Sequence, residues 1–136
     1  MKSQRMKEQE TKRSKARYQE SASLETRFLV MGSLNYHYIY SLDHIVEPGE
    51  TIASVKLDKA CGGKGFNQAA ALAKAGARVY LAGLVGADGG QMLETAQEFG
   101  VDCRFVQERD NRTGHAIIQV DKNGQNSIVL YGGTNR

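Results

Sequence analysis

GGKGFNQAAALAKAG, residues 62–76, is a glycine-rich turn that runs directly into a series of small, helix-favouring residues. Alanine, leucine and lysine favour a helix, whereas a run of glycines does not. We therefore predict a helix that begins near Gly65 and ends at Ala75. Gly76 then stands where a left-handed C-terminal cap is expected.

The start of this helix favours a ligand that carries hydroxyl groups. Glycines let a ligand approach the main chain closely, and the first turn of a helix presents N–H groups that have no partner within the helix. Such a helix start suits hydroxyl oxygens or an anion. Asn67 can donate and accept hydrogen bonds, and Lys64 can only donate them. A polyhydroxylated ligand fits these groups.

Two nucleotide-binding motifs are excluded at this stretch, and a simpler interpretation stays open. The GxxxxGK[ST] spacing of a P-loop is absent because Lys64 is followed by Gly65. The GxGxxG dinucleotide fingerprint is absent as well. The simpler interpretation is a glycine-rich turn whose only role is to let the helix pack tightly on a sheet.

Apolar runs on both sides of the helix predict a parallel sheet. Residues 27–33 and 79–85 are short, continuous apolar runs, which are typical of buried strands. With the helix between them, they form a crossover with a parallel pair. Residues 91–99 then predict an amphipathic helix and residues 101–106 a third strand.

A further pair of strands predicts a flap beside this sheet, and a second pair predicts a hairpin. Residues 36–46 and 51–59 lie on either side of a turn at Pro48-Gly49-Glu50. Residues 113–120 and 126–131 flank an Asn-Gly pair, which is a strong hairpin signal. We expect the tyrosines at 36, 38 and 40 to pack on the flap rather than to stack on bases.

Position in the fold nominates further candidate residues. Asn35 and His37 follow the first strand, and ligands gather at the carboxyl ends of strands in open α/β sheets. For His37, a hydrogen-bonded or exposed histidine without a ligand is an equal alternative. Asp88 fits a catalytic role or, as we prefer, a structural role at a turn and helix start. We expect Cys61 to be a small buried side chain.

Composition points to a small cytoplasmic domain with a charged extension. The chain is 40% hydrophobic, its two cysteines have no disulfide or metal spacing, and no apolar run suggests a membrane span or a secretory signal. Residues 1–27 hold eight Lys/Arg and four Asp/Glu, whereas the remainder has a net charge of −1. We expect residues 1–26 to be a disordered, solvated extension, and a basic arm that binds nucleic acid is the less favoured alternative.

From about Phe28 to Asn135 the chain resembles the N-terminal part of a ribokinase-like carbohydrate kinase of the PfkB family. An ordered series of motifs carries the resemblance: GSLN at 32–35, PGET at 48–51, GGKGFNQA at 62–69, Gly76, Gly86, Asp88, Thr113-Gly114 and GGTN at 132–135. The GGKGxNQ form, together with the Asn-Gly hairpin and the glycine-Asn loop after it, is closest to the ribokinase branch.

The resemblance implies a fold and a set of site residues. It implies that residues 27–136 form part of a doubly wound α/β sheet, truncated at the C-terminal side, with a small β-flap lid at about residues 36–59 and 113–131. In this family the lid closes over the sugar and often forms a homodimer contact. The implied sugar contacts are Asn35, Gly63, Lys64 and Asn67, with Ala116 and Ile118 as apolar contacts from the lid.

One of these positions departs from the family pattern. His37 stands where the family has an aspartate that grips sugar hydroxyls. Histidine removes an acceptor-only carboxylate. This departure argues against ribose as the ligand and allows a nucleoside or a differently hydroxylated sugar instead.

The resemblance also implies groups that this chain does not contain. The family's catalytic aspartate lies in a GAGD motif, which is absent here, so no catalytic residue is assigned. ATP, magnesium and a monovalent cation are expected for the complete family member, at sites outside this chain. Because phosphoryl transfer depends on positioning and electrostatic stabilisation, we expect the sugar-binding half to be inactive alone. The alternatives are a non-catalytic sugar-binding or dimerising module, or the product of a degraded or partial gene.

Overall fold

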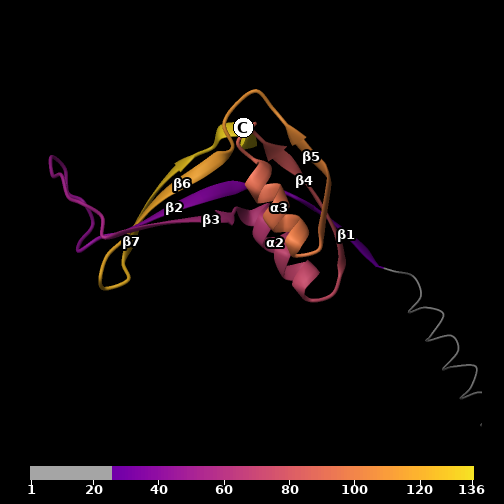
Figure 1. Cartoon of the computed structure of the whole chain (residues 1–136), viewed down its shortest axis with the longest axis horizontal. Coiled ribbons are helices and arrows are strands. Elements are labelled where there is room, and N and C mark those ends of the chain that lie inside the picture. The colour runs from indigo at the N-terminus through magenta and orange to yellow at the C-terminus, as the bar shows by residue number, and fades with distance from the viewer. Residues whose placement is uncertain (1–25) are drawn as a thin grey trace, which may run out of the picture.

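The structure of the chain is a computed structural model, and it describes residues 26–136. The extension expected at residues 1–26 therefore lies, except for Thr26, outside the described residues. The described part contains two sheets that diverge from a shared corner, with two helices beside the first sheet (Figure 1).

The first sheet is parallel and has three strands in the order β1-β4-β5. Its strands are β1 (Arg27–Met31), β4 (Arg78–Val85) and β5 (Val101–Glu108). The crossovers between them contain α2 (Lys64–Lys74) and α3 (Gly90–Glu98). This arrangement confirms the predicted parallel pair, both helices and the third strand.

The second sheet has four strands in the order β3-β2-β6-β7, and it extends away from the helices (Figure 1). Its strands are β2 (Asn35–Ser41), β3 (Lys56–Gly62), β6 (Gly114–Val120) and β7 (Asn126–Tyr131). The central pair β2/β6 is parallel, and both outer pairs are antiparallel. A short 3₁₀ turn, η1 (Gly133–Asn135), follows β7.

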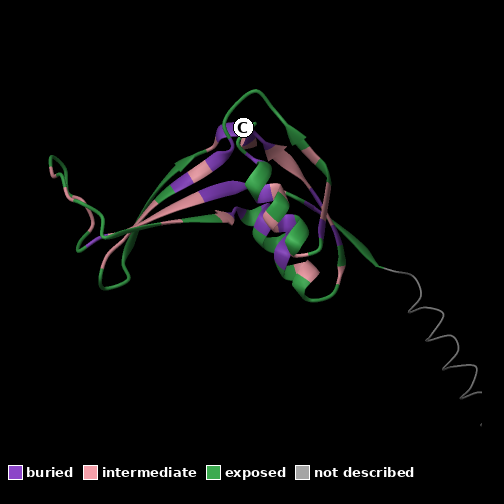
Figure 2. Ribbon diagram, viewed as in Figure 1, coloured by how far each residue is buried: buried purple, intermediate pink, exposed green. Residues whose placement is uncertain are grey.

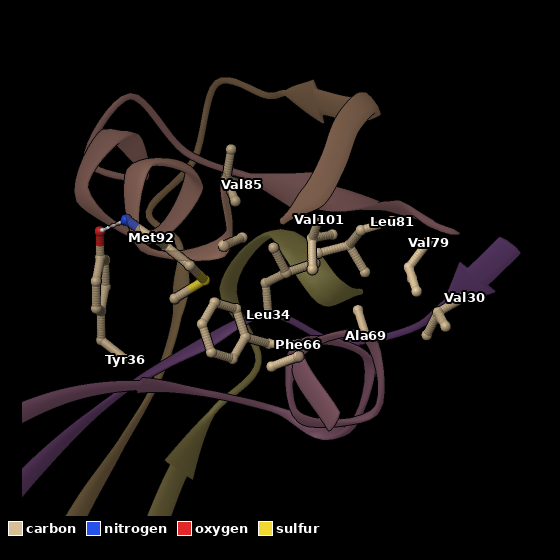
Figure 3. Close-up of a cluster of buried hydrophobic side chains, with 12 residues drawn as sticks. Val30, Leu34, Tyr36, Phe66, Ala69, Val79, Leu81, Val85, Met92 and Val101 are labelled. Carbon is tan, nitrogen blue, oxygen red and sulfur yellow. Dashed lines mark hydrogen bonds between the residues drawn. The ribbon is translucent and has the colours of Figure 1, made fainter. Parts of the chain in front are cut away.

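The hydrophobic core lies between the first sheet and the two helices (Figure 3). Val79, Leu81 and Val85 face it from β4, and Met92 of α3 is fully buried in it. Phe66 and Ala69 of α2 complete this layer. Both helices pack on the same face of the sheet. Alternate residues of a strand point to opposite faces, so only every second residue of β4 reaches this core.

The opposite face of the first sheet is bare, which corrects the prediction that residues 27–33 form a buried strand. Val30 is the buried residue of β1, whereas Leu29 is 63% and Met31 82% exposed. Phe105 of β5 is also exposed. Figure 2 shows exposed stretches, in green, on β1 and β5. A continuous apolar run is typical of a strand that is buried on both faces of its sheet. Within the described residues, nothing covers the face of the first sheet that lies opposite the helices.

The end of α2 matches the prediction in detail. Its C-cap is Ala75, and Gly76 has a φ of 87°, in the left-handed region. The N–H of Gly76 donates to the carbonyl of Ala73, and that of Ala77 to the carbonyl of Leu72. These bonds satisfy carbonyls at the helix end, which is the role expected of a glycine cap.

The predicted strand at residues 51–59 is wrong in its bounds. The observed strand β3 begins at Lys56 and continues to Gly62, because Gly62 pairs with Asn35 across the sheet. Ile52 and Val55 lie instead in the connection between β2 and β3. The turn around Gly49 is confirmed, since Gly49 has a φ of 84° and the N–H of Glu50 donates to the carbonyl of Glu47.

Candidate functional site

The start of α2 lies where the two sheets meet, and Ser33 accepts hydrogen bonds from the N–H groups of the first turn of α2. The hydroxyl of Ser33 accepts from the N–H of Lys64 at 3.1 Å. Its carbonyl accepts from the N–H groups of Gly65 and Phe66 at 3.1 and 3.3 Å. The expectation that these N–H groups face a ligand is therefore wrong, because the loop after β1 satisfies them.

Gly63, one residue earlier, is the exception. It is buried and has a φ of 98°, and a Cβ there would lie 2.4 Å from the Ser33 carbonyl oxygen and 3.0 Å from the Asn35 nitrogen. Only glycine fits this conformation and this close approach. Within residues 26–136 the N–H of Gly63 has no hydrogen-bond partner. It is the main-chain donor at this helix start that stays available to a ligand.

The strand register brings four of the predicted site residues onto one face of the second sheet. His37 of β2 pairs with Ala116 of β6, and Ile39 pairs with Ile118. Asn35 lies two residues before His37, so these side chains point the same way. The His37 ring lies against Gly62 of β3, where an added Cβ would meet it at 2.5 Å.

The two remaining predicted site residues lie on the first turn of α2. The side chains of Lys64 and Asn67 are exposed. Within the described residues neither side chain forms a hydrogen bond or an ion pair. Both are therefore free to reach a ligand beside Gly63, although the structure does not bring them into contact with Asn35 or His37.

Asn135 is a residue that the sequence analysis assigned no role. Its Oδ1 accepts from the Leu34 N–H at 3.0 Å, and its Nδ2 donates to the Leu34 carbonyl at 3.1 Å. The same Nδ2 lies 3.0 Å from Oδ1 of Asn35. The signal in the sequence was an Asn that follows paired glycines, a type of residue that often bonds to nearby main chain.

Tyr36 points to the opposite face of the second sheet and joins it to α3 (Figure 3). Its hydroxyl donates to the Asp88 carbonyl at 2.9 Å and accepts from the Met92 N–H at 3.2 Å. Burial raises the pKa of this hydroxyl, and the bond from Met92 acts in the other direction. Tyr36 therefore packs against the body of the molecule rather than only on the flap.

Asp88 has the structural contacts that we preferred for it. Its Oδ1 accepts from both the N–H and the hydroxyl of Thr113, at 2.9 and 2.6 Å. Desolvation raises the pKa of Asp88, but these bonds and the charge of Arg112 outweigh it, so the pKa is lowered. Asp88 thereby fastens the turn before α3 to the start of β6.

Two kinds of feature are absent from the described part of the chain. Residues 26–136 hold no group of three or more His, Cys, Asp or Glu side chains that could bind a metal ion. No helix in the same range is long and apolar enough to cross a membrane. The donors at this site are amides, a lysine and an imidazole, which suit hydroxyl oxygens better than a metal cation.

Comparisons with known proteins identify close relatives. Residues 25–136 match the family model described as pfkB family carbohydrate kinase. The chain is 38% identical over 109 residues to a ribokinase of Haemophilus influenzae, which covers 78% of this chain and 36% of the relative.

Solved structures give the same result. A ribokinase of Cryptococcus neoformans in complex with ADP matches with a TM-score of 0.75 and 46% identity over 81% of this chain and 36% of that one. A ribokinase of Arabidopsis thaliana complexed with ribose and ATP matches with a TM-score of 0.70 and 35% identity, over 79% and 36% of the two chains. The chain thus spans about a third of the length of these relatives.

Proposed function

The chain belongs to the pfkB family of carbohydrate kinases, and on that premise we propose that residues 27–136 bind the sugar acceptor of an ATP-dependent sugar kinase. The observation that carries the proposal is that two donors on neighbouring residues have no hydrogen-bond partner within residues 26–136. Gly63 offers its main-chain N–H, and the buried side chain of Asn35 offers Nδ2. The two residues are close, since a Cβ at Gly63 would lie 3.0 Å from the Asn35 main-chain nitrogen, and such donors suit the oxygens of sugar hydroxyls.

The second sheet supplies the other contacts of the proposed site and acts as its lid. Ala116 and Ile118 lie on the same face as His37; Ile118 is partly exposed there, and Ala116 is 3% exposed. We propose that both lie against the carbon face of a sugar ring. Lys64 and Asn67 add exposed polar groups from the first turn of α2. We propose that residues 27–136 form the N-terminal portion of a carbohydrate kinase domain, and that residues 36–59 and 113–131 within it form a moving lid.

His37 bears on which acceptor is bound. Its ring packs on Gly62 and faces the same side as Asn35. A neutral imidazole donates from one nitrogen and accepts at the other, whereas a carboxylate accepts two hydroxyls. We propose that this change weakens ribose binding relative to a sugar or nucleoside with a different hydroxyl pattern.

The phosphoryl-transfer step is not assigned to these residues. No GAGD motif occurs in the chain, and residues 26–136 hold no group of three or more His, Cys, Asp or Glu side chains that could bind a metal ion. We propose that ATP and its metal ions bind outside residues 27–136 and that these residues alone do not transfer phosphate.

Both cysteines are free thiols, which suits the reducing cytoplasm that we propose for the protein.

A non-catalytic dimerising module is the second candidate, and exposed apolar residues on the second sheet favour it. Ile117 of β6 and Val129 and Tyr131 of β7 share one face of this sheet and are all at least 40% exposed. Apolar side chains gathered on one sheet mark a contact surface, and a homodimer through the lid covers them. Such a dimer is compatible with sugar binding and does not require catalysis.

Calorimetric titration tests the proposed sugar site directly. We expect the chain to bind a member of a panel of pentoses, hexoses and nucleosides and to show no binding of ATP. Asn35→Ala should weaken that binding about tenfold, because it removes one hydrogen bond. Asn123→Ala, at the exposed tip of the β6–β7 hairpin, is the matched control. Binding that Asn35→Ala leaves unchanged would contradict the proposed site.

A further inference from the structure

The side-chain amide of Asn135 has an orientation that its neighbours determine. The Leu34 N–H can only donate, so the atom of Asn135 that it meets at 3.0 Å must be the oxygen. The carbonyls of Leu34 and Gly132 can only accept, so the atom that lies 3.1 and 3.0 Å from them must be the nitrogen. The main chain therefore holds this amide in one orientation.

The fixed orientation of the Asn135 amide also determines the orientation of the Asn35 amide. Nδ2 of Asn135 can only donate, so the atom of Asn35 that lies 3.0 Å away must be Oδ1. Nδ2 of Asn35 is thereby turned away from Asn135. Within residues 26–136 that nitrogen has no hydrogen-bond partner, and no buried side-chain nitrogen or oxygen in this range is left unpaired. Nδ2 of Asn35 therefore reaches solvent, although the residue as a whole is only 8% exposed.

The glycine below the pair keeps the two amides together. A Cβ at Gly114 would lie 2.2 Å from Nδ2 of Asn135 and 2.3 Å from Oδ1 of Asn35. Any other residue at this position of β6 would displace one amide or the other. Gly114 pairs with Asn35 in the parallel register, so the pairing of β2 with β6 sets the distance between Gly114 and Asn35.

We propose that Asn135 is a positioning residue that fixes Asn35 as a hydrogen-bond donor toward the bound sugar. The inference rests on the proposed function, in which Asn35 contacts a hydroxyl oxygen. Asn135 does not touch the sugar itself. It determines which atom of Asn35 does, from a turn 100 residues further along the chain.

The orientation can be tested without a ligand, by NMR of the side-chain NH₂ groups in the whole chain. We expect the NH₂ protons of Asn35 to exchange rapidly with water, because they reach solvent. Those of Asn135 should exchange slowly, because three acceptors surround them. Slow exchange at Asn35 and rapid exchange at Asn135 would overturn the proposal, whether or not the chain binds a sugar.

Substitution of Asn135 then tests the consequence for binding, with D-ribose as the probe. Asp at position 135 can still accept from the Leu34 N–H, but it can no longer donate to Asn35. In Asn135→Asp we expect Asn35 to turn over, its NH₂ to become protected, and D-ribose binding to weaken about tenfold, the equivalent of one hydrogen bond. In an Asn35→Ala background the same substitution should have no further effect on binding.

The outcomes separate this inference from the proposed function. If D-ribose shifts the NH₂ signal of Asn35 equally in the wild type and in Asn135→Asp, the sugar site stands and the positioning role fails. If D-ribose shifts no signal but the exchange pattern is as expected, the positioning role stands and ribose is the wrong ligand. An equal loss of binding from Asn135→Asp in the Asn35→Ala background would show a general structural role instead.

Discussion

At the residue scale, the Tyr36 hydroxyl forms one of the polar links between the second sheet and α3, and Lys59 and Cys61 of β3 form others with Gln91 and Thr95. Tyr36→Phe removes the bonds to the Asp88 carbonyl and the Met92 N–H while it keeps the buried ring. We expect the free energy of unfolding to fall by about 1 kcal/mol, because the Met92 N–H also donates to the Gly89 carbonyl and keeps that partner.

Denaturant unfolding measures this change. Tyr40→Phe is the matched control, since Tyr40 lies on the same strand and its hydroxyl forms no hydrogen bond within the described residues. An equal effect of the two substitutions would show that the hydroxyl of Tyr36 does not join the two parts.

His37 is the residue at which we expect this site to depart from the family pattern. His37→Asp restores an acceptor-only side chain on the face that Asn35 and Ala116 share. We expect affinity for D-ribose to rise about tenfold or more, because hydrogen bonds to a charged group are the stronger ones.

Titration calorimetry with D-ribose measures the effect of His37→Asp. His115→Asp is the control, because His115 lies on the opposite face, between the rings of Tyr38 and Tyr131. Unchanged or weaker ribose binding in His37→Asp would remove His37 from the acceptor site.

At the element scale, the connection between β2 and β3 is held by an ion pair that responds to pH. His44 Nε2 lies 2.7 Å from Glu50, whose other oxygen accepts from the Glu47 N–H. Glu50 foremost, and Asp43 to a lesser extent, raise the pKa of His44 above its ordinary value of 6.5. The contribution of this pair to stability is therefore fully present below pH 6.5 and is lost as the pH rises through the raised pKa.

Amide exchange at Glu47 and Glu50 between pH 5 and 9, corrected for its intrinsic pH dependence, measures this response. We expect protection of these amides to fall as His44 loses its proton, and Glu50→Gln to bring the pKa of His44 back toward its ordinary value. Asp43 is also paired with Lys122 at 2.9 Å, so this second contact remains at high pH. Protection that does not change across this range would contradict the role of the pair.

Elements specified by local sequence were predictable, and those specified by distant contacts were not. The helix from Lys64 and its cap at Gly76 follow from alanine and glycine positions along the chain. The bounds of β3 depend on pairing with β2, and this pairing carries the strand through Gly62, where a glycine suggested a break.

The same distinction applies to the site. Position after β1 was enough to nominate Asn35 and His37, which share one face of β2. The partners of the α2 N–H groups come from Ser33, some thirty residues earlier, and the partner of Asn35 comes from Asn135. The glycines before Asn135 signal only a bond to nearby main chain, and nothing local signals its contact with Asn35 or the contacts of Ser33, because tertiary packing brings those residues together.

At the scale of the whole molecule, the bare face of the first sheet is an apolar surface. Leu29, Met31 and Phe105 are all more than half exposed on it, beside an open groove lined by residues such as Ala82 and Leu84. Contiguous apolar patches of this kind bind hydrophobic dyes and other proteins. We expect the chain to bind such a dye at this face.

Dye fluorescence with surface variants tests this expectation. Met31→Lys and Phe105→Lys should each lower the fluorescence without lowering the melting temperature by more than a few degrees, because neither side chain is buried. Leu130→Lys, on the second sheet, is the matched control. A fall in dye binding confined to Leu130→Lys would place the apolar surface on the lid instead.

We propose that residues 27–136 bind the sugar acceptor and that another part of the kinase is required for catalysis. A phosphorylation assay on two proteins tests this proposal. One is this chain alone; the other is this chain fused to the part of the Cryptococcus neoformans ribokinase that it does not cover. Both are given ATP, magnesium, potassium and a panel of sugars and nucleosides. We predict transfer only by the fusion, with Asn35→Ala lowering it and Asn123→Ala leaving it unchanged. Transfer by the chain alone, or no transfer by a folded fusion, would contradict the claim that residues 27–136 hold the sugar acceptor and require another part for catalysis.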